Sequence, residues 1–244
     1  MFTGLLGLRL GRYRERIAGH FAEALNPDRS LRSLLFFAAL YHDICKPETK
    51  LVEESGRIRF FDHEQKGAEV AAARLRSFNL SNHEIERARA IVKNHMRIHA
   101  FADRMERDKQ TPSRKAVYRF FRDSGEAGVD LILLALADLR AARAHTLTIE
   151  TWTVYLDVAR ILLEHYYEKP EEAVSPPRLL DGNLLMKELG VKPGPVVGQL
   201  LESIRENQAA GKIQTREQAL AFAREELQTM QLSAFNSQPQ KGES

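Results

Sequence analysis

The feature that most constrains this chain is a hydrophobic pattern at helical spacing that continues through most of its 244 residues. Apolar residues that recur three and four positions apart predict helices with one buried face. The pattern breaks at residues 49–61, TKLVEESGRIRFF, where two short alternating runs flank Ser55-Gly56 and predict a β-hairpin. We therefore expect an all-α helical bundle with one small hairpin. The predicted helices of the first two thirds of the chain cover residues 5–24, 31–44, 63–78, 81–95, 111–125, 128–146 and 150–168.

The chain is expected to contain two helical parts joined by a linker. Residues 168–178, EKPEEAVSPPR, are rich in proline and glutamate, which is typical of a connecting segment. After it, Thr215 and Gln218 form a capping box that predicts the start of another helix. The predicted organisation is a helical domain at 1–168, a linker at 169–178, a helical tail domain at 179–231 and a disordered tail at 232–244.

Composition excludes several classes of protein. A single cysteine, Cys45, allows no intrachain disulfide and suits a reducing compartment. No apolar run approaches the roughly 20 residues needed to cross a bilayer. The opening, MFTGLLGLRLGRYRERI, is too interrupted by glycine and arginine for a secretory signal. A net charge of +3 permits contact with nucleic acid without requiring it. We expect a cytoplasmic protein with no membrane partner.

Histidine and aspartate residues at structural transitions form the main chemical pattern. His42 and Asp43 directly follow the apolar run LLFFAALY, His63 lies in FDHE, and His95 lies in KNHM. Asp138 interrupts the apolar helix LLALADLRA, where a carboxylate is costly unless it is paired or binds a metal. Helical bundles build metal sites from such side chains on several helices. The pattern predicts a site for a divalent ion, with Mg, Mn, Fe, Co, Ni and Zn all possible.

Each of these residues also has a purely structural interpretation. The His-Asp pair can fall at a helix end by coincidence, and the two later histidines can be capping or core residues satisfied by hydrogen bonds. Asp138 can pair with Arg140 or Arg143, although spacings of two and five residues place neither arginine well on a helix.

Hydrolysis of a phosphate ester is the reaction that a metal at these residues would support. A metal ion polarises a phosphoryl oxygen and lowers the pKa of water. His42, Asp43 and Lys46 would then be the catalytic residues. The first two are also ligands, and Lys46 would contact a phosphate oxygen as a point charge. Basic faces are usually only solvated, but near a metal they attract phosphate. The candidates for phosphate or RNA binding are Lys46, Arg97, Arg140 and Arg143.

Several stretches together resemble a known family. They are LLFFAALYHDICKPET, GRIRFFDHEQKGAE and LSNHEIERARAIVKNHMR, followed by a C-terminal segment that contains KPGPVVGQLLESIRENQAAGKIQTREQALAFA. In order and spacing they are similar to the HD and tail regions of bacterial tRNA nucleotidyltransferases (CCA-adding enzymes) and poly(A) polymerases, within the HD-domain superfamily of metal-dependent phosphohydrolases. The resemblance covers about residues 12–226.

The resemblance implies roles for particular residues. It makes His42, Asp43 and Asp138 metal ligands, and it matches His63 and His95 to extra histidines of members that bind one or two metals. It also implies nucleotide or RNA, including tRNA, as a partner.

The sequence departs from the family pattern at several positions. Cys45 and Asp62 stand where glycine is usual, and a small buried thiol is the simpler interpretation of Cys45 than an extra ligand. His20 has a possible spacing for the family's upstream histidine, but its context favours a helix-packing residue. No nucleotidyltransferase head is recognised, so we do not expect this chain to add nucleotides by itself.

Two functions from different classes therefore stay open at this stage. One is a metal-dependent phosphohydrolase. The other is a non-catalytic tRNA- or RNA-binding body and tail of a split or truncated tRNA nucleotidyltransferase, with a separate head protein as partner.

Overall fold

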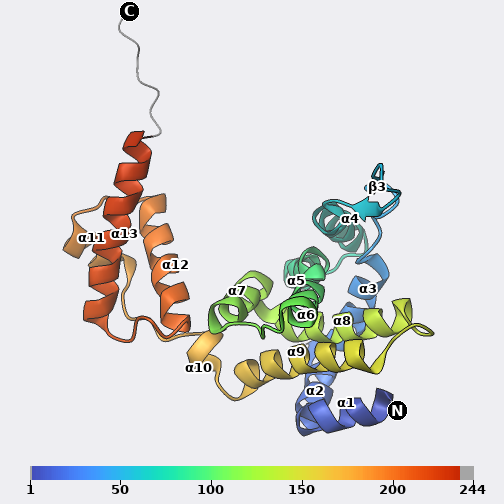
Figure 1. Ribbon diagram of the computed structural model, residues 1–244. Coiled ribbons are helices and arrows are strands. Elements are labelled where there is room, and N and C mark those ends of the chain that lie inside the picture. Colours follow the sequence, from blue (N-terminus) through green and yellow to red (C-terminus); the bar gives the residue numbers. More distant parts are fainter. Residues whose placement is uncertain (1, 237–244) are drawn as a thin grey trace, which may run out of the picture. The chain divides into compact units, whose positions relative to one another are not determined.

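The computed structural model describes residues 2–236, and helices dominate it (Figure 1). The expectation of an all-α protein is confirmed, and the expected hairpin is present as β3 (Lys50–Val52) paired antiparallel with β4 (Ile58–Phe60). No helix in the described part of the chain is long and apolar enough to cross a membrane. The described residues divide into two compact units, which are residues 2–112 with 120–168, and residues 113–119 with 169–236.

The first unit contains most of the helices. Its core is formed by apolar side chains that are almost fully buried, among them Phe120, Leu131, Trp152 and Leu162. Helix α6 packs against both α8 and α9. The elements in chain order are α1 (Phe2–Leu10), α2 (Arg14–Ala22), α3 (Leu31–Tyr41), α4 (His63–Ser77), α5 (Asn82–Asn94), α6 (Met96–Asp108), the end of α7 (Arg114–Ser124), α8 (Gly128–Ala142) and α9 (Ile149–Tyr167).

Close packing of α4 on α5 holds the His-Asp turn in place. The α4 face is made of small residues, with Ala68, Ala71 and Ala72 almost fully buried. Gly67 lies where a Cβ atom would come within 3.3 Å of Val92 and 3.6 Å of the carbonyl oxygen of His42. Glycine at this position therefore lets α4 approach the turn that follows α3.

A second small hairpin, β1 (Ala24–Asn26) with β2 (Arg29–Ser30), was not expected from the sequence. Glu84 at the start of α5 holds it, because its carboxylate accepts hydrogen bonds from Asn26 and Arg29. The same carboxylate completes the expected capping box with Ser81. A tertiary contact thus fixes the conformation of a segment that is too short for its own sequence to predict a strand.

Two other expectations about helices need correction. The predicted helix at 5–24 is interrupted by a single 3-10 turn at Gly11–Tyr13, whose Tyr13 ring is buried. Helix α6 was not predicted, and it begins directly after His95, the single residue that separates it from the end of α5 at Asn94. The chain turns between two helices there without a glycine or proline to mark the boundary.

The second unit is a small helical bundle with its own core. Buried Leu185, Leu200, Ile204 and Ala223 form that core. They lie on α11 (Gly182–Leu189), α12 (Pro195–Ala209) and α13 (Arg216–Asn236), and a short helix α10 (Pro170–Ala173) lies within the predicted linker.

The expected disordered tail at 232–244 is wrong in part. Residues 232–236 continue α13, and residues 237–244 lie outside the described residues. Leu227 and Met230 pack against the core of this unit and anchor the last turns of the helix. Extending a helix that already exists costs little, so residues without strong apolar character can continue it.

The start of α8 tolerates no side chain beyond hydrogen. A Cβ atom on Gly128 would lie 2.6 Å from the ring of Phe121, which is buried and stacked on Tyr166. We expect Gly128→Ala to lower the free energy of unfolding by about 1–3 kcal/mol, as overpacked cores do. Urea denaturation measures the loss. Gly19→Ala is the control, because no atom lies within 4 Å of its Cβ position in the middle of α2; equal stability of the two variants would contradict the prediction.

The Glu84 carboxylate should make stability depend on pH. Hydrogen bonding to Arg29 is the largest of the effects that lower the pKa of Glu84 to about 2. A lowered folded-state pKa stabilises the fold above the unfolded value of 4.5, and this stabilisation is lost as the pH falls toward 2. We expect Glu84→Gln to lose about 1–3 kcal/mol at pH 7 and to flatten the decline between pH 4.5 and 2. Glu86→Gln, at an exposed position of the same helix, should leave both quantities unchanged in urea titrations.

Candidate metal centre

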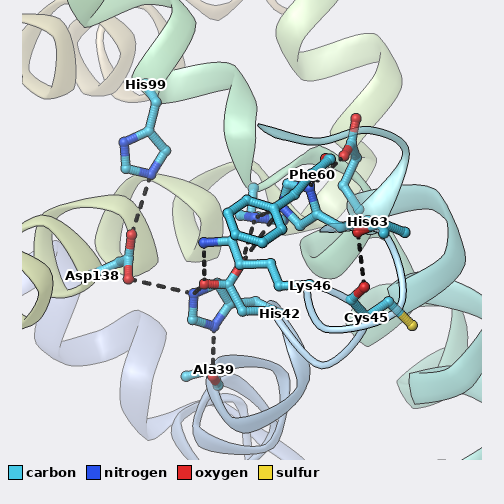
Figure 2. Close-up of polar contacts among 12 residues, drawn as sticks. Ala39, His42, Cys45, Lys46, Phe60, His63, His99 and Asp138 are labelled. Atoms are coloured by element: carbon cyan, nitrogen blue, oxygen red, sulfur yellow. Dashed lines mark hydrogen bonds and ion pairs between the residues drawn. The ribbon is translucent and has the colours of Figure 1, made fainter. Parts of the chain in front are cut away.

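Three histidines and two aspartates from separate stretches of the sequence meet in the first unit. Figure 2 labels His42, His63 and Asp138 among them. Within the described residues, their ligand atoms form two groups that could each hold an ion. One group consists of Asp43, His63 and His95, and the other of His42, Asp43 and Asp138. Asp43 belongs to both, so it is the centre of the arrangement.

The first group has the spacing of ligands around one ion. The Nε2 atoms of His63 and His95 lie 3.2 Å apart, and each lies 3.5 Å from Oδ1 of Asp43. Two ligands that are each about 2.1 Å from a metal lie about 3.0–3.4 Å apart in octahedral or tetrahedral geometry. The three atoms therefore fit one small divalent ion.

Backbone carbonyls orient the three ligand histidines. Nδ1 of His42, His63 and His95 each lies 2.7 Å from the carbonyl oxygen three residues earlier, those of Ala39, Phe60 and Val92. An Nδ1–H that donates to a carbonyl leaves the lone pair of Nε2 directed at the site, which is the usual arrangement in metal-bound histidine. The two neighbouring lone pairs of His63 and His95 would repel each other unless a cation lies between them.

The second group joins the turn after α3 to α8. Nε2 of His42 lies 3.3 Å from Oδ2 of Asp43 and 3.4 Å from Oδ1 of Asp138. Burial by itself would lower the pKa of His42, but contact with Asp138 and Asp43 raises it to about 10. His42, above all, holds the pKa of Asp138 below its usual range. The two carboxylates thus require a positive charge at Nε2, from a proton or a metal ion.

Unpaired buried atoms indicate that the residues present fit a metal. Nε2 of His42 and Oδ1 of Asp43 are buried and have no hydrogen-bond partner among the described residues. A buried polar atom without a partner is costly, and these two face the same site as the other ligand atoms. The donor set of imidazole and carboxylate suits a divalent transition metal.

Other residues near the site support it without joining the two groups. The Nζ atom of Lys46 lies 2.6 Å from Oδ2 of Asp43 and 5.6 Å from the centre of the Phe60 ring.

Burial raises the pKa of the Cys45 thiol, and its sulfur points away from Asp138 and His42 in Figure 2. Asp62 adopts a φ of 58°, a left-handed conformation that glycine favours and aspartate tolerates. That conformation explains why glycine is usual at this position.

Two of the arginines predicted to bind phosphate have other partners here. Arg97 pairs with Asp123 on α7, and the guanidinium of Arg140 lies 5.7 Å from the ring of Trp152. Arg143 is exposed at the end of α8. A role of these arginines in binding phosphate or RNA stays a prediction.

His20 lies in a different network. Its Nε2 is 2.7 Å from Oδ1 of Asp130, whose other oxygen accepts a hydrogen bond from Arg87 at 2.8 Å. Asp130 is buried, so this pair joins α2 and α5 to α8 in the core. His20 belongs to neither ligand group.

Among the residues near the site, His99 is the one whose position there the sequence indicated most weakly. It lies one turn after His95 on α6, with Nε2 3.5 Å from Oδ2 of Asp138 and Nδ1 2.7 Å from the hydroxyl of Tyr155. Burial is the largest of the effects that lower its pKa. In the sequence, only the spacing of four residues from His95 indicated that the two side chains lie on the same face.

Comparison with known proteins agrees with this geometry. The HD domain family matches residues 15–181, a range that contains every residue of both ligand groups. This chain belongs to the HD-domain family.

Two curated relatives of this HD-domain chain are tRNA nucleotidyltransferases. It is 34% identical over 197 residues to a CC-adding tRNA nucleotidyltransferase of Thermus thermophilus, and 34% identical over 211 residues to an A-adding tRNA nucleotidyltransferase of Deinococcus radiodurans. The matches cover 80% and 83% of this chain but only 40% and 45% of those proteins. No solved structure matches significantly.

Metal binding should depend on Asp43 more than on any other residue, because it serves both groups. We expect Asp43→Asn to abolish binding of Zn²⁺ or Mn²⁺, and Asp138→Asn to weaken only the ions bound by the His42 group. Calorimetric titration measures affinity and stoichiometry. His145→Gln, at an exposed position outside the site, is the control. Unchanged stoichiometry in Asp43→Asn would contradict the assignment.

Proposed function

We propose that this HD-domain protein is a metal-dependent phosphohydrolase that acts on a phosphate ester of a nucleotide or RNA. The observation that supports this most strongly is the carboxylate of Asp43, whose Oδ1 faces His63 and His95 while Oδ2 faces His42. Metals bound there would be hydrolytic centres because a divalent ion polarises a phosphoryl oxygen and lowers the pKa of water.

The chain's own residues divide the remaining work. His42, His63, His95, Asp43 and Asp138 hold the metal, with the Nδ1 contacts to carbonyls keeping the imidazoles in place.

Lys46 balances the charge of Asp43 and supplies a cation at the edge of the site. Because its side chain is 37% exposed, it is able to contact a phosphate oxygen of an arriving substrate. The half-buried Phe60 ring lies beside the ammonium group, where an apolar part of a nucleotide has a surface to contact.

A phosphatase assay tests this function. The purified protein is incubated with bis(p-nitrophenyl) phosphate, p-nitrophenyl phosphate and 2′,3′-cyclic AMP, each with Mn²⁺, Ni²⁺ or Zn²⁺. We expect metal-dependent turnover of at least one ester, and a loss of at least about 100-fold in Asp43→Ala, because no metal is then held. His145→Gln should keep full activity. Activity that survives in both Asp43→Ala and a chelator would refute the proposal.

A second function is favoured by the relatives. Both of the 34% identical proteins are tRNA nucleotidyltransferases, and this chain spans less than half of each. The alternative is a non-catalytic chain that binds tRNA or RNA, with a separate nucleotidyltransferase head as partner. It predicts tRNA binding that survives a chelator and weakens steeply with salt. No tRNA complex in 50 mM salt, measured by gel shift, would count against it.

A further inference from the structure

The oxygen of Asp138 that faces away from His42 contacts His99. Asp138 lies on α8 and His99 on α6, and the separation of Nε2 from Oδ2 is 3.5 Å. Figure 2 shows His99 on one side of Asp138 and His42 on the other. Each oxygen of this carboxylate therefore faces a different imidazole, which limits its rotation.

Tyr155 determines where His99 carries its proton. The Tyr155 side chain on α9 is 4% exposed, and burial is the largest of the effects that raise its pKa, so the hydroxyl keeps its proton. In residues 2–236 its hydroxyl has one hydrogen-bond partner, Nδ1 of His99 at 2.7 Å. A buried hydroxyl donates to an available acceptor, and Nδ1 accepts only when the proton of the imidazole is on Nε2.

The tautomer of His99 is thus opposite to that of the ligand histidines. His63 and His95 donate from Nδ1 to carbonyl oxygens and direct Nε2 at the site as an electron-pair donor. His99 directs an Nε2–H group toward Asp138 instead. An N–H group cannot bind a metal, but it does donate a hydrogen bond to a carboxylate.

We propose that Tyr155 and His99 are positioning residues for Asp138, an inference that rests on the proposed function of the same site. The hydroxyl of Tyr155 donates to Nδ1 of His99 at 2.7 Å, and the Nε2–H group of His99 faces Oδ2 of Asp138 at 3.5 Å. This polar contact holds Oδ1 toward His42, and the proton on Nε2 keeps His99 out of the ligand set. Carboxylate ligands are commonly held by such hydrogen bonds, and removing one costs about 10–100-fold in metal affinity.

The tautomer is measured directly, without metal or substrate. Long-range ¹H–¹⁵N spectra of the metal-free protein distinguish a protonated Nε2 from a protonated Nδ1 for each histidine. We expect His99 to carry its proton on Nε2 while His63 and His95 carry theirs on Nδ1. Tyr155→Phe, which keeps the ring, should remove this fixed preference of His99. A proton on Nδ1 of His99 in the unmodified protein would overturn the proposal.

Metal titration separates a positioning role from a ligand role. The amide of glutamine places an N–H group near the position of Nε2, so His99→Gln should retain Zn²⁺ affinity within about threefold. His99→Leu and Tyr155→Phe should each weaken the ion of the His42 group by about 10–100-fold and leave that of the His63 group unchanged. Equal losses in His99→Gln and His99→Leu would show a ligand role and overturn the proposal.

The two proposals fail in different ways. If the protein binds Zn²⁺ but hydrolyses none of the esters, the phosphohydrolase function fails while the spectra and titrations still decide the role of His99. If hydrolysis is metal-dependent but His99 carries its proton on Nδ1, only the positioning role fails.

Discussion

The carboxylate of Asp43 is the interaction on which the site depends, because its two oxygens face different groups of imidazoles. Its side chain lies on the turn after α3 beside His42, and its other two imidazole partners come from the start of α4 and the junction of α5 with α6. Burial alone would raise the pKa of Asp43, but contacts with His42, His95 and Lys46 hold it well below its usual range. The charge of Asp43 therefore has to be matched by cations, whether ammonium, proton or metal.

Helix ends are the local structures that make this site possible. His42, His63 and His95 each lie at the end or start of a helix, and each directs Nδ1 to the carbonyl three residues earlier. That contact fixes the tautomer and the direction of Nε2 together. Asp138 differs because it lies inside α8, where no helix end orients it. Contacts from His42 and His99 on either side perform this task.

The sequence was most informative at residues whose burial costs free energy, because these residues differ from their apolar neighbours in the sequence. Asp138 in an apolar helix and the His-Asp pair after an apolar run were recognisable because a buried carboxylate needs a partner. The hairpin at β3–β4 was recognisable from alternation around Gly56. The β1–β2 hairpin and helix α6 were not, because Glu84 fixes the first from a distant position and no breaker residue marks the start of the second.

By itself, the sequence determined the helical class, the main apolar faces and the residue types able to hold a metal. These follow from periodicity and from the cost of burying charge, which are local properties. Only the tertiary structure decided which side chains meet. It placed His20 with Asp130 in the core and His99 between Tyr155 and Asp138. Such contacts join residues more than 30 positions apart, and their geometry is set by the packing of whole helices, which no local pattern records.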